Sequence, residues 1–212
     1  MAKSLRMFLG CCCAVLLFSA CSSKSTIDSN VEVTPDRVPL SCIAVLPAST
    51  SVVKDETIDY EKAQALEKGA VYATEVIQQL LQGQAKVRIV SAHQLSTYEP
   101  DVSGGISGTV AALGQKLDCD AVLLTTVRQY RQRQGTEYAV DAPAAVDFFM
   151  VLRHSTDGNI LWSADFREEQ QSVLSNIFTF GKAKSRGFKW VTVEHLMAEG
   201  IKDRLKDCPY LQ

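Results

Sequence analysis

Three histidines and one pair of carboxylates are the residue types in this chain that most often carry acid–base chemistry. His93, His154 and His195 lie far apart in the sequence, and none belongs to a recognisable pattern with a nucleophile. Glu168 and Glu169 are adjacent at the polar end of an expected strand, which favours solvated carboxylates over a catalytic pair. Because catalysis needs a nucleophile, a base and an orienting group together, the sequence predicts that the chain is not an enzyme and has no cofactor.

A glycine-rich stretch at residues 103–108 is the best candidate for a small-ligand site. It reads SGGISG and precedes an expected helix, so its backbone N–H groups are free to approach an anion at the helix N-terminus. The alternative is a flexible loop in which Ser107 caps that helix.

A basic and aromatic stretch at residues 176–190 is the best candidate for a contact surface, because no acidic residue lies between Glu169 and Glu194. Aromatic and basic side chains together suit a protein contact or a membrane interface. In the alternative interpretation, the rings fold back onto the core while the basic groups stay in water. The candidate surface consists of Phe178, Phe180, Lys182, Lys184, Arg186, Phe188 and Trp190.

The N-terminus has the organisation of a secretory signal. Lys3 and Arg6 precede an apolar run from Met7 to Phe18, and small residues follow before Cys21. About a dozen apolar residues are too few to form a permanent membrane-spanning helix. We therefore expect residues 1–20 to be removed as a signal peptide.

The sequence LFSAC at 17–21 resembles the lipobox of bacterial lipoproteins. That resemblance implies that Cys21 is acylated, carries palmitate and becomes the mature N-terminus. Ser22 follows it, where an aspartate in many such lipoproteins signals retention at the inner membrane, so the implied location is the periplasmic face of the outer membrane. The alternative is an ordinary secretory signal followed by a chance cysteine.

The mature chain has the composition of one globular domain. Without Lys3 and Arg6, its 22 basic residues become 20 against 24 acidic ones, a net charge of −4 that gives no reason to expect nucleic-acid binding. Polar residues 21–40 are typical of a flexible tether, and residues 41–212 are expected to form a single periplasmic domain.

Hydrophobic patterning predicts five strands and three helices. Apolar runs predict strands at 42–47, 87–90 and 121–127, while the Asp157-Gly158 turn predicts a hairpin of strands 146–153 and 160–166. Helical spacing predicts helices over 66–80 and 110–117, with Gly83 ending the first. A last helix is expected to begin at Thr192 as its N-cap and to stop at Cys208-Pro209.

This order predicts a three-layer α/β domain with a mixed sheet. Two right-handed crossovers give the strand order 2-1-3, and the hairpin extends the sheet to 2-1-3-4-5. Besides Cys21, the mature chain has three cysteines, whose spacing matches no metal site; an odd number permits one disulfide and one buried thiol. The predicted topology brings all three to one sheet edge, and we expect Cys208 to pair with Cys119, or alternatively with Cys42.

The element order and three short motifs resemble a group of bacterial periplasmic domains. The motifs are IAVLP at 43–47, CDAVL at 119–123 and DGNILW at 157–162. The group includes the curli-secretion lipoprotein, the lipoprotein activator of penicillin-binding proteins and the N-terminal domain of TolB, and the resemblance spans roughly residues 40–207. It implies an accessory or assembly factor that binds an envelope protein, rather than an enzyme. The alternative is a small-ligand-binding protein or an enzyme that uses the 103–108 loop.

Overall fold

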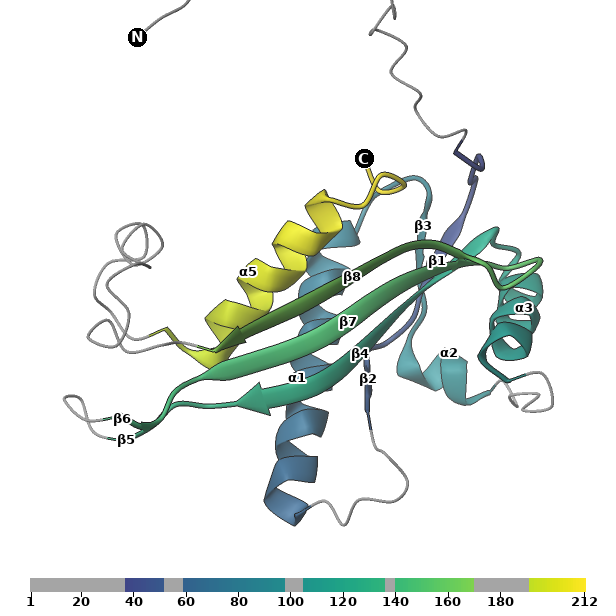
Figure 1. The fold of residues 1–212 in the computed structure, drawn as a ribbon. Coiled ribbons are helices and arrows are strands. Elements are labelled where there is room, and N and C mark those ends of the chain that lie inside the picture. The colour runs from purple at the N-terminus through teal and green to yellow at the C-terminus, as the bar shows by residue number, and fades with distance from the viewer. Residues whose placement is uncertain (1–36, 52–58, 98–104, 136–139, 170–190) are drawn as a thin grey trace, which may run out of the picture. The chain divides into compact units, whose positions relative to one another are not determined.

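A computed structural model of the chain describes residues 37–51, 59–97, 105–135, 140–169 and 191–212. Residues 39–212 form one compact unit. Its main sheet contains six strands in the order β3-β1-β4-β7-β8, with β2 beside β4 (Figure 1). The strands are β1 (Ile43–Val45), β2 (Ser49–Thr50), β3 (Val87–Ile89), β4 (Ala121–Arg131), β7 (Ala145–His154) and β8 (Ile160–Glu169). The predicted order 2-1-3-4-5 is therefore confirmed.

Helices cover both faces of this sheet, which confirms the three-layer fold. They are α1 (Tyr60–Leu81), α2 (Ala92–Ser96), α3 (Gly105–Leu117) and α5 (Val193–Lys206). Helices α1 and α5 pack on one face, over the larger hydrophobic core, while α3 packs on the opposite face over a smaller one. None of the helices in the described ranges combines the length and apolarity needed to cross a membrane.

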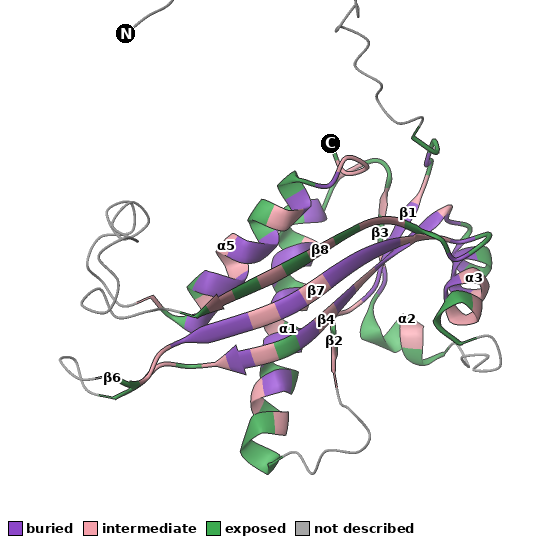
Figure 2. Cartoon of the chain, in the orientation of Figure 1, coloured by how far each residue is buried: buried purple, intermediate pink, exposed green. Residues whose placement is uncertain are grey.

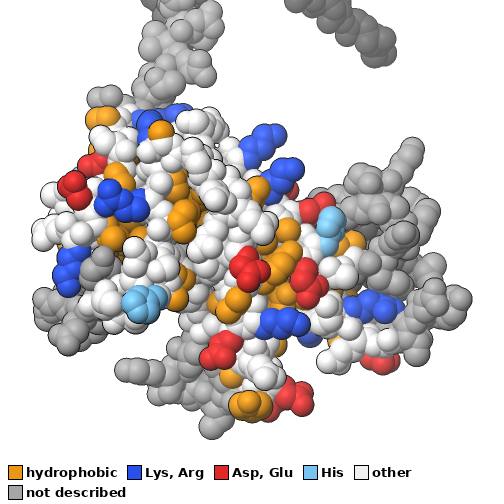
Figure 3. Space-filling view, turned by 180° about the vertical axis from the view of Figure 1, so that it is seen from behind, with side chains coloured by type: hydrophobic (Ala, Val, Ile, Leu, Met, Phe, Trp, Pro, Cys, Tyr) orange, Lys and Arg blue, Asp and Glu red, His pale blue; other side chains and the backbone are white. Residues whose placement is uncertain are grey.

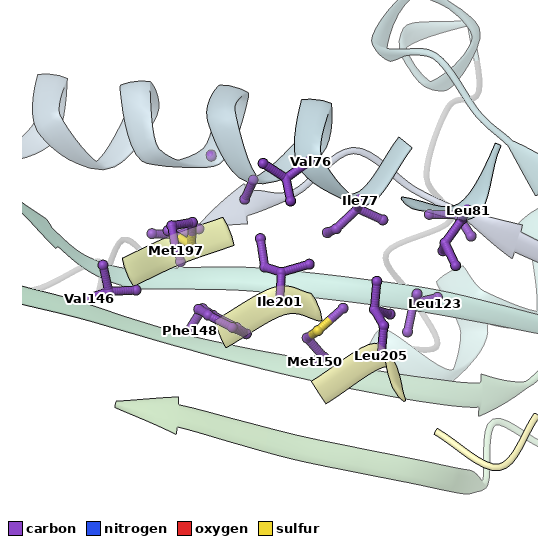
Figure 4. Packing of buried hydrophobic residues seen from close by; sticks show 14 of the residues in the cluster. Val76, Ile77, Leu81, Leu123, Val146, Phe148, Met150, Met197, Ile201 and Leu205 are labelled. Atoms are coloured by element: carbon purple, nitrogen blue, oxygen red, sulfur yellow. The ribbon is translucent and has the colours of Figure 1, made fainter. Parts of the chain in front are cut away.

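The larger core lies between α1, α5 and the inner faces of β4, β7 and β8. Figure 4 shows Ile77 of α1 and Ile201 of α5 converging on Phe148 and Met150 of β7. Alternate residues of β7 point into this core, and the pattern of buried and half-buried positions is visible in Figure 2. The apolar face predicted for the last helix is confirmed, because all five residues named by the pattern are buried: Val193, Leu196, Met197, Ile201 and Leu205.

Local signals explain where several elements begin and end. The Thr192 side chain accepts a hydrogen bond from the His195 N–H and caps α5, as predicted. Gly83 follows the end of α1 with φ of +83°, and Gly158 has φ of +68° in the β7–β8 turn. Both values lie in the left-handed region, where glycine has no steric penalty. The predicted helix end and hairpin turn are thus confirmed.

Four short elements lie outside the predicted set. Strand β2 and helix α2 fall between the predicted elements, and β4 continues past Val127 to Arg131. Beyond it, β5 (Gln134–Gly135) and β6 (Val140–Ala142) form a small separate antiparallel pair. The extension of β4 is stabilised by cross-strand pairs, since Arg128 pairs with Asp147 of β7 and Arg131 with Glu169 of β8.

The disulfide prediction was wrong. Cys42 is bonded to Cys119, with Cα atoms 4.6 Å apart, and Cys208 is a buried free thiol. Cys42 lies directly before β1 and Cys119 two residues before the parallel strand β4, and both pack in the smaller core. Cys208 follows α5 and packs in the larger core, on the other face of the sheet. Burial raises the pKa of the Cys208 thiol, so it is less readily ionised than an exposed cysteine.

Asp120 links the residues just before β1 to the start of β4. Its Oδ2 accepts hydrogen bonds from the backbone N–H groups of Ser41 and Cys42, at 2.5 and 3.1 Å. These bonds lower the pKa of Asp120, because they stabilise its charged form. The Asp120 N–H in turn donates to the Cys42 carbonyl at 3.0 Å. This reciprocal contact fixes the two cysteines within bonding distance.

Candidate functional site

A groove with a volume of about 1030 Å³ lies on the α3 side of the sheet. Strands β4 and β7 form its floor, with helices α2 and α3 as its walls. Its apolar lining includes Leu124, Phe149 and Val151 from the floor, Val110 and Leu113 from α3, and Leu95 from α2. This volume is slightly above the range of about 300–1,000 Å³ that is usual for small-molecule sites.

The strand register explains why the groove floor is apolar. Leu124 is opposite Val151, and Thr126 is opposite Phe149, so these four side chains share the α3-side face of the sheet. Helix α3 is 13 residues long and covers the beginning of β4, where Val122 is buried. Leu124, Thr126 and Phe149 lie farther along the sheet and are half-buried. Helix α3 therefore covers the α3-side face of β4 only near the beginning of the strand.

Among the described residues, the charged side chains that line the groove are both basic, Lys116 of α3 and Arg153 of β7. Arg153 Nη1 donates a hydrogen bond to the Gly158 carbonyl at 2.8 Å. Its Nε is buried and has no hydrogen-bond partner among the described residues. The groove therefore combines apolar walls with positive charge at its lining.

The glycine-rich stretch contributes to this groove only through its second half. Gly105 and Ile106 line the groove, while residues 103 and 104 lie outside the described residues. Helix α3 begins at Gly105, so Ser107 lies in its first turn, and the predicted N-cap role of Ser107 was wrong. Ser107 instead packs beneath the β7–β8 turn, where a Cβ added to Gly158 would come within 2.6 Å of the Ser107 Cβ.

A row of charged residues continues the same sheet face beyond the groove. Arg128 pairs with Asp147 at 2.7 Å and also with Asp165, and its guanidinium lies 5.8 Å from the centre of the Phe149 ring. Burial opposes the charge of Arg128, but its hydrogen bonds to Asp165 and Asp147 raise its pKa overall. Arg167 of β8 adds a longer contact to Asp147, at 3.9 Å. The charges of these two arginines and two aspartates balance one another. They form the polar end of the α3-side face of the sheet.

The three histidines do not meet in one site. His93 is exposed on α2, His154 is hydrogen-bonded to Asp157 at 3.0 Å, and His195 contacts Glu199 at 3.3 Å. Of the two adjacent carboxylates Glu168 and Glu169, Glu169 forms an ion pair with Arg131. Within the described ranges, no group of three or more His, Cys, Asp or Glu side chains is placed to hold a metal ion.

Strand β8 forms one edge of the main sheet. It pairs with β7 along its whole length, and within the described ranges no strand lies on its other side. Exposed Ser163, Asp165 and Arg167 alternate with half-buried Trp162, Ala164 and Phe166, as the sequence pattern predicts. The pattern fails at the start of the strand, because Ile160 is 55% exposed and Leu161 packs against the larger core. The contact-surface residues from Phe178 to Trp190 and the acylation residue Cys21 lie outside the described residues.

The side of the molecule seen from behind carries charges of both signs. In Figure 3, acidic and basic side chains are interspersed with hydrophobic ones, and no single sign of charge covers the coloured part of this face. Such mixing is typical of a solvated protein surface. The candidate site is therefore the groove and the adjoining edge of the sheet.

Comparisons with known proteins give structural neighbours only. No protein-family model matches the chain, and no curated protein matches it. A PelC dodecamer from Paraburkholderia phytofirmans is 17% identical, with a TM-score of 0.44 over 81% of this chain and 87% of that one. Lipoprotein GNA1162 from Neisseria meningitidis is 21% identical, with a TM-score of 0.40 over 69% and 92%. The LpoB C-terminal domain from Escherichia coli is 19% identical, with a TM-score of 0.38 over 63% and 86%. No family membership follows from these values.

Proposed function

We propose that the chain is a lipoprotein, acylated on Cys21 and anchored at the periplasmic face of the outer membrane. There it acts as a non-enzymatic accessory or assembly factor that binds a protein of an envelope complex. The lipobox at 17–21 supports the anchor, and Ser22 supports the outer-membrane location. The polar residues that follow Cys21 would let the domain reach a partner away from the lipid surface.

The observation that carries the protein–protein part of this proposal is the edge strand β8. Ten residues of extended backbone, Ile160–Glu169, pair with β7 on one side. An edge strand with unpaired backbone groups accepts an additional strand from a partner. Asp165 and Arg167, exposed on one face, would limit unselective pairing with other chains. The basic and aromatic stretch 176–190 follows β8 in the sequence and would extend the same contact.

Photo-crosslinking in intact cells tests this contact. A benzophenone amino acid placed at exposed Ser163 of β8 should give one discrete adduct with an envelope protein. The same probe at exposed Glu67 of α1 is the matched control and should give none. Changing Phe180→Ala and Lys184→Glu together should lower the yield of the Ser163 adduct while leaving the melting temperature nearly unchanged. Equal adduct patterns from positions 163 and 67, or no adduct from position 163, would contradict the proposed contact.

A second candidate function, small-ligand binding, is favoured by the groove between α2 and α3. The glycine-rich stretch contributes Gly105 and Ile106 to its lining, and the cavity is large enough for a small molecule. This function is compatible with the first, because the groove and the outer edge of β8 are different surfaces.

A further inference from the structure

We infer that the groove between α2 and α3 binds a long-chain fatty acid, with the acyl chain along the apolar floor and the carboxylate at Arg153. This inference deepens the second candidate function and rests on it. It does not depend on the protein contact proposed for β8.

The lining of the groove selects for an apolar chain. Leu124 and Val151 contribute to the floor, and Leu95 of α2 packs against the smaller core that contains Val110 of α3. At the margin, Ile106 leaves 65% of its surface exposed, and an acyl chain in the groove would cover part of that surface. An apolar ligand is favoured because its methylene groups leave water, and each buried methylene is worth about a four-fold gain in affinity.

The charges of the groove select for an anionic head. Among the described residues, Arg153 and Lys116 are the charged side chains of its lining, and none of the described lining residues is a carboxylate. The Arg153 guanidinium uses Nη1 on the Gly158 carbonyl, which leaves its buried Nε without a partner among the described residues. A guanidinium binds a carboxylate through two parallel N–H groups, so a fatty-acid head would satisfy this donor. Asp157, in the β7–β8 turn, is hydrogen-bonded to His154 and to the Asn159 N–H, and Asp147 and Asp165 are paired with Arg128.

The position of Arg153 also fixes the orientation of the ligand. Arg153 lies one residue before the end of β7, opposite Val122 and Ile160, while Phe149 lies four residues earlier on the same face. The carboxylate would therefore lie near the β7–β8 turn. The acyl chain would extend over Val151 toward Phe149 and end before the row formed by Arg128, Asp147 and Asp165.

Photo-labelling of the full-length lipidated protein in lipid nanodiscs tests this assignment. The probe is palmitic acid that carries a diazirine on its chain, and the adducts are mapped by peptide mass spectrometry. We expect the adducts to concentrate on peptides that contain α3 and β7. Ala112→Trp fills the groove from α3, and Arg153→Gln removes the cation; each should lower the adduct yield at least ten-fold. Lys202→Gln, on the exposed side of α5, is the matched control and should not change the yield.

Two further comparisons test the contribution of the acyl chain and that of the carboxylate separately. Unlabelled fatty acids of 8, 12 and 16 carbons should compete with increasing strength, by roughly ten-fold or more for every two methylenes that enter the groove. The corresponding diazirine alcohol should label the groove at least ten-fold less than the acid. Equal labelling by alcohol and acid would overturn the fatty-acid assignment but retain a ligand-binding groove. Labelling spread over other peptides, or labelling unchanged in a folded Ala112→Trp variant, would overturn both the fatty-acid assignment and the ligand-binding groove. The Ser163 adduct would still report separately on the proposed protein partner.

Discussion

Replacing both Cys42 and Cys119 with alanine should lower the free energy of unfolding by about 2–5 kcal/mol. The two residues are 77 positions apart in the sequence, so their bond closes a long loop and restricts the unfolded chain. The chain-entropy description gives a loop of this length between about 3 and about 4.7 kcal/mol, as an upper figure. The bond also ties the start of β1 to the start of β4, at the centre of the sheet.

Denaturant unfolding measures this effect, with Cys208→Ala as the control. Cys208 is buried but unbonded, so its replacement should cost much less than loss of the disulfide. In unfolded, non-reduced protein purified from the membrane fraction, an alkylating reagent should label Cys208 and leave Cys42 and Cys119 unlabelled. Protection of Cys208, or a loss in Cys208→Ala as large as in the double variant, would contradict the observed pairing.

Phe148→Ala should lower the free energy of unfolding by about 3–5 kcal/mol. Phe148 is completely buried at the centre of the larger core, and its ring stacks on Phe166 with centroids 5.1 Å apart. Its removal would leave a cavity between β7, β8 and α5, because the neighbouring side chains are held by both helices (Figure 4).

Phe149→Ala provides the matched control for this substitution. Phe149 is the next residue along β7, and its half-buried ring points to the opposite face, at the groove. Its loss should therefore cost only about 1–2 kcal/mol. Thermal and denaturant unfolding of both variants checks the difference, and equal losses would mean that the two faces of β7 are buried to the same extent.

Most of the sheet could be predicted because its signals are local. Apolar runs at β1 and β4, alternation in β8 and the Asp157-Gly158 turn each depend on neighbouring residues. The strand order then followed from the handedness of two crossovers. Strand β2, helix α2 and the β5–β6 pair contain two to five residues each, which is too short for a periodic pattern to develop.

The disulfide could not be predicted from the same signals, because it depends on which face of the sheet the last helix covers. The expected pairing of Cys208 with Cys119 required α5 to end beside the start of the third predicted strand, now β4. Helix α5 packs instead across β7 and β8 and beside α1. Hydrophobic spacing shows that a helix has an apolar face, but it does not show which strands that face contacts.

The groove was missed because its residues are distributed over several elements. The apolar run of β4 is typical of a strand buried on both faces, yet Leu124 on the α3-side face is only half-buried. Helix α3, although longer than the expected helix over 110–117, packs over the beginning of β4 and leaves the face toward Phe149 half-buried.

The central claim, that the chain is an outer-membrane lipoprotein, is tested most directly by labelling cells with palmitate and separating their membranes by density. The wild-type protein should carry the label and sediment with the outer membrane. Cys21→Ala should lose the label completely and leave that fraction, while Cys208→Ala should behave as the wild type. Continued labelling of Cys21→Ala, or an unlabelled wild-type protein in the soluble periplasmic fraction, would contradict the account.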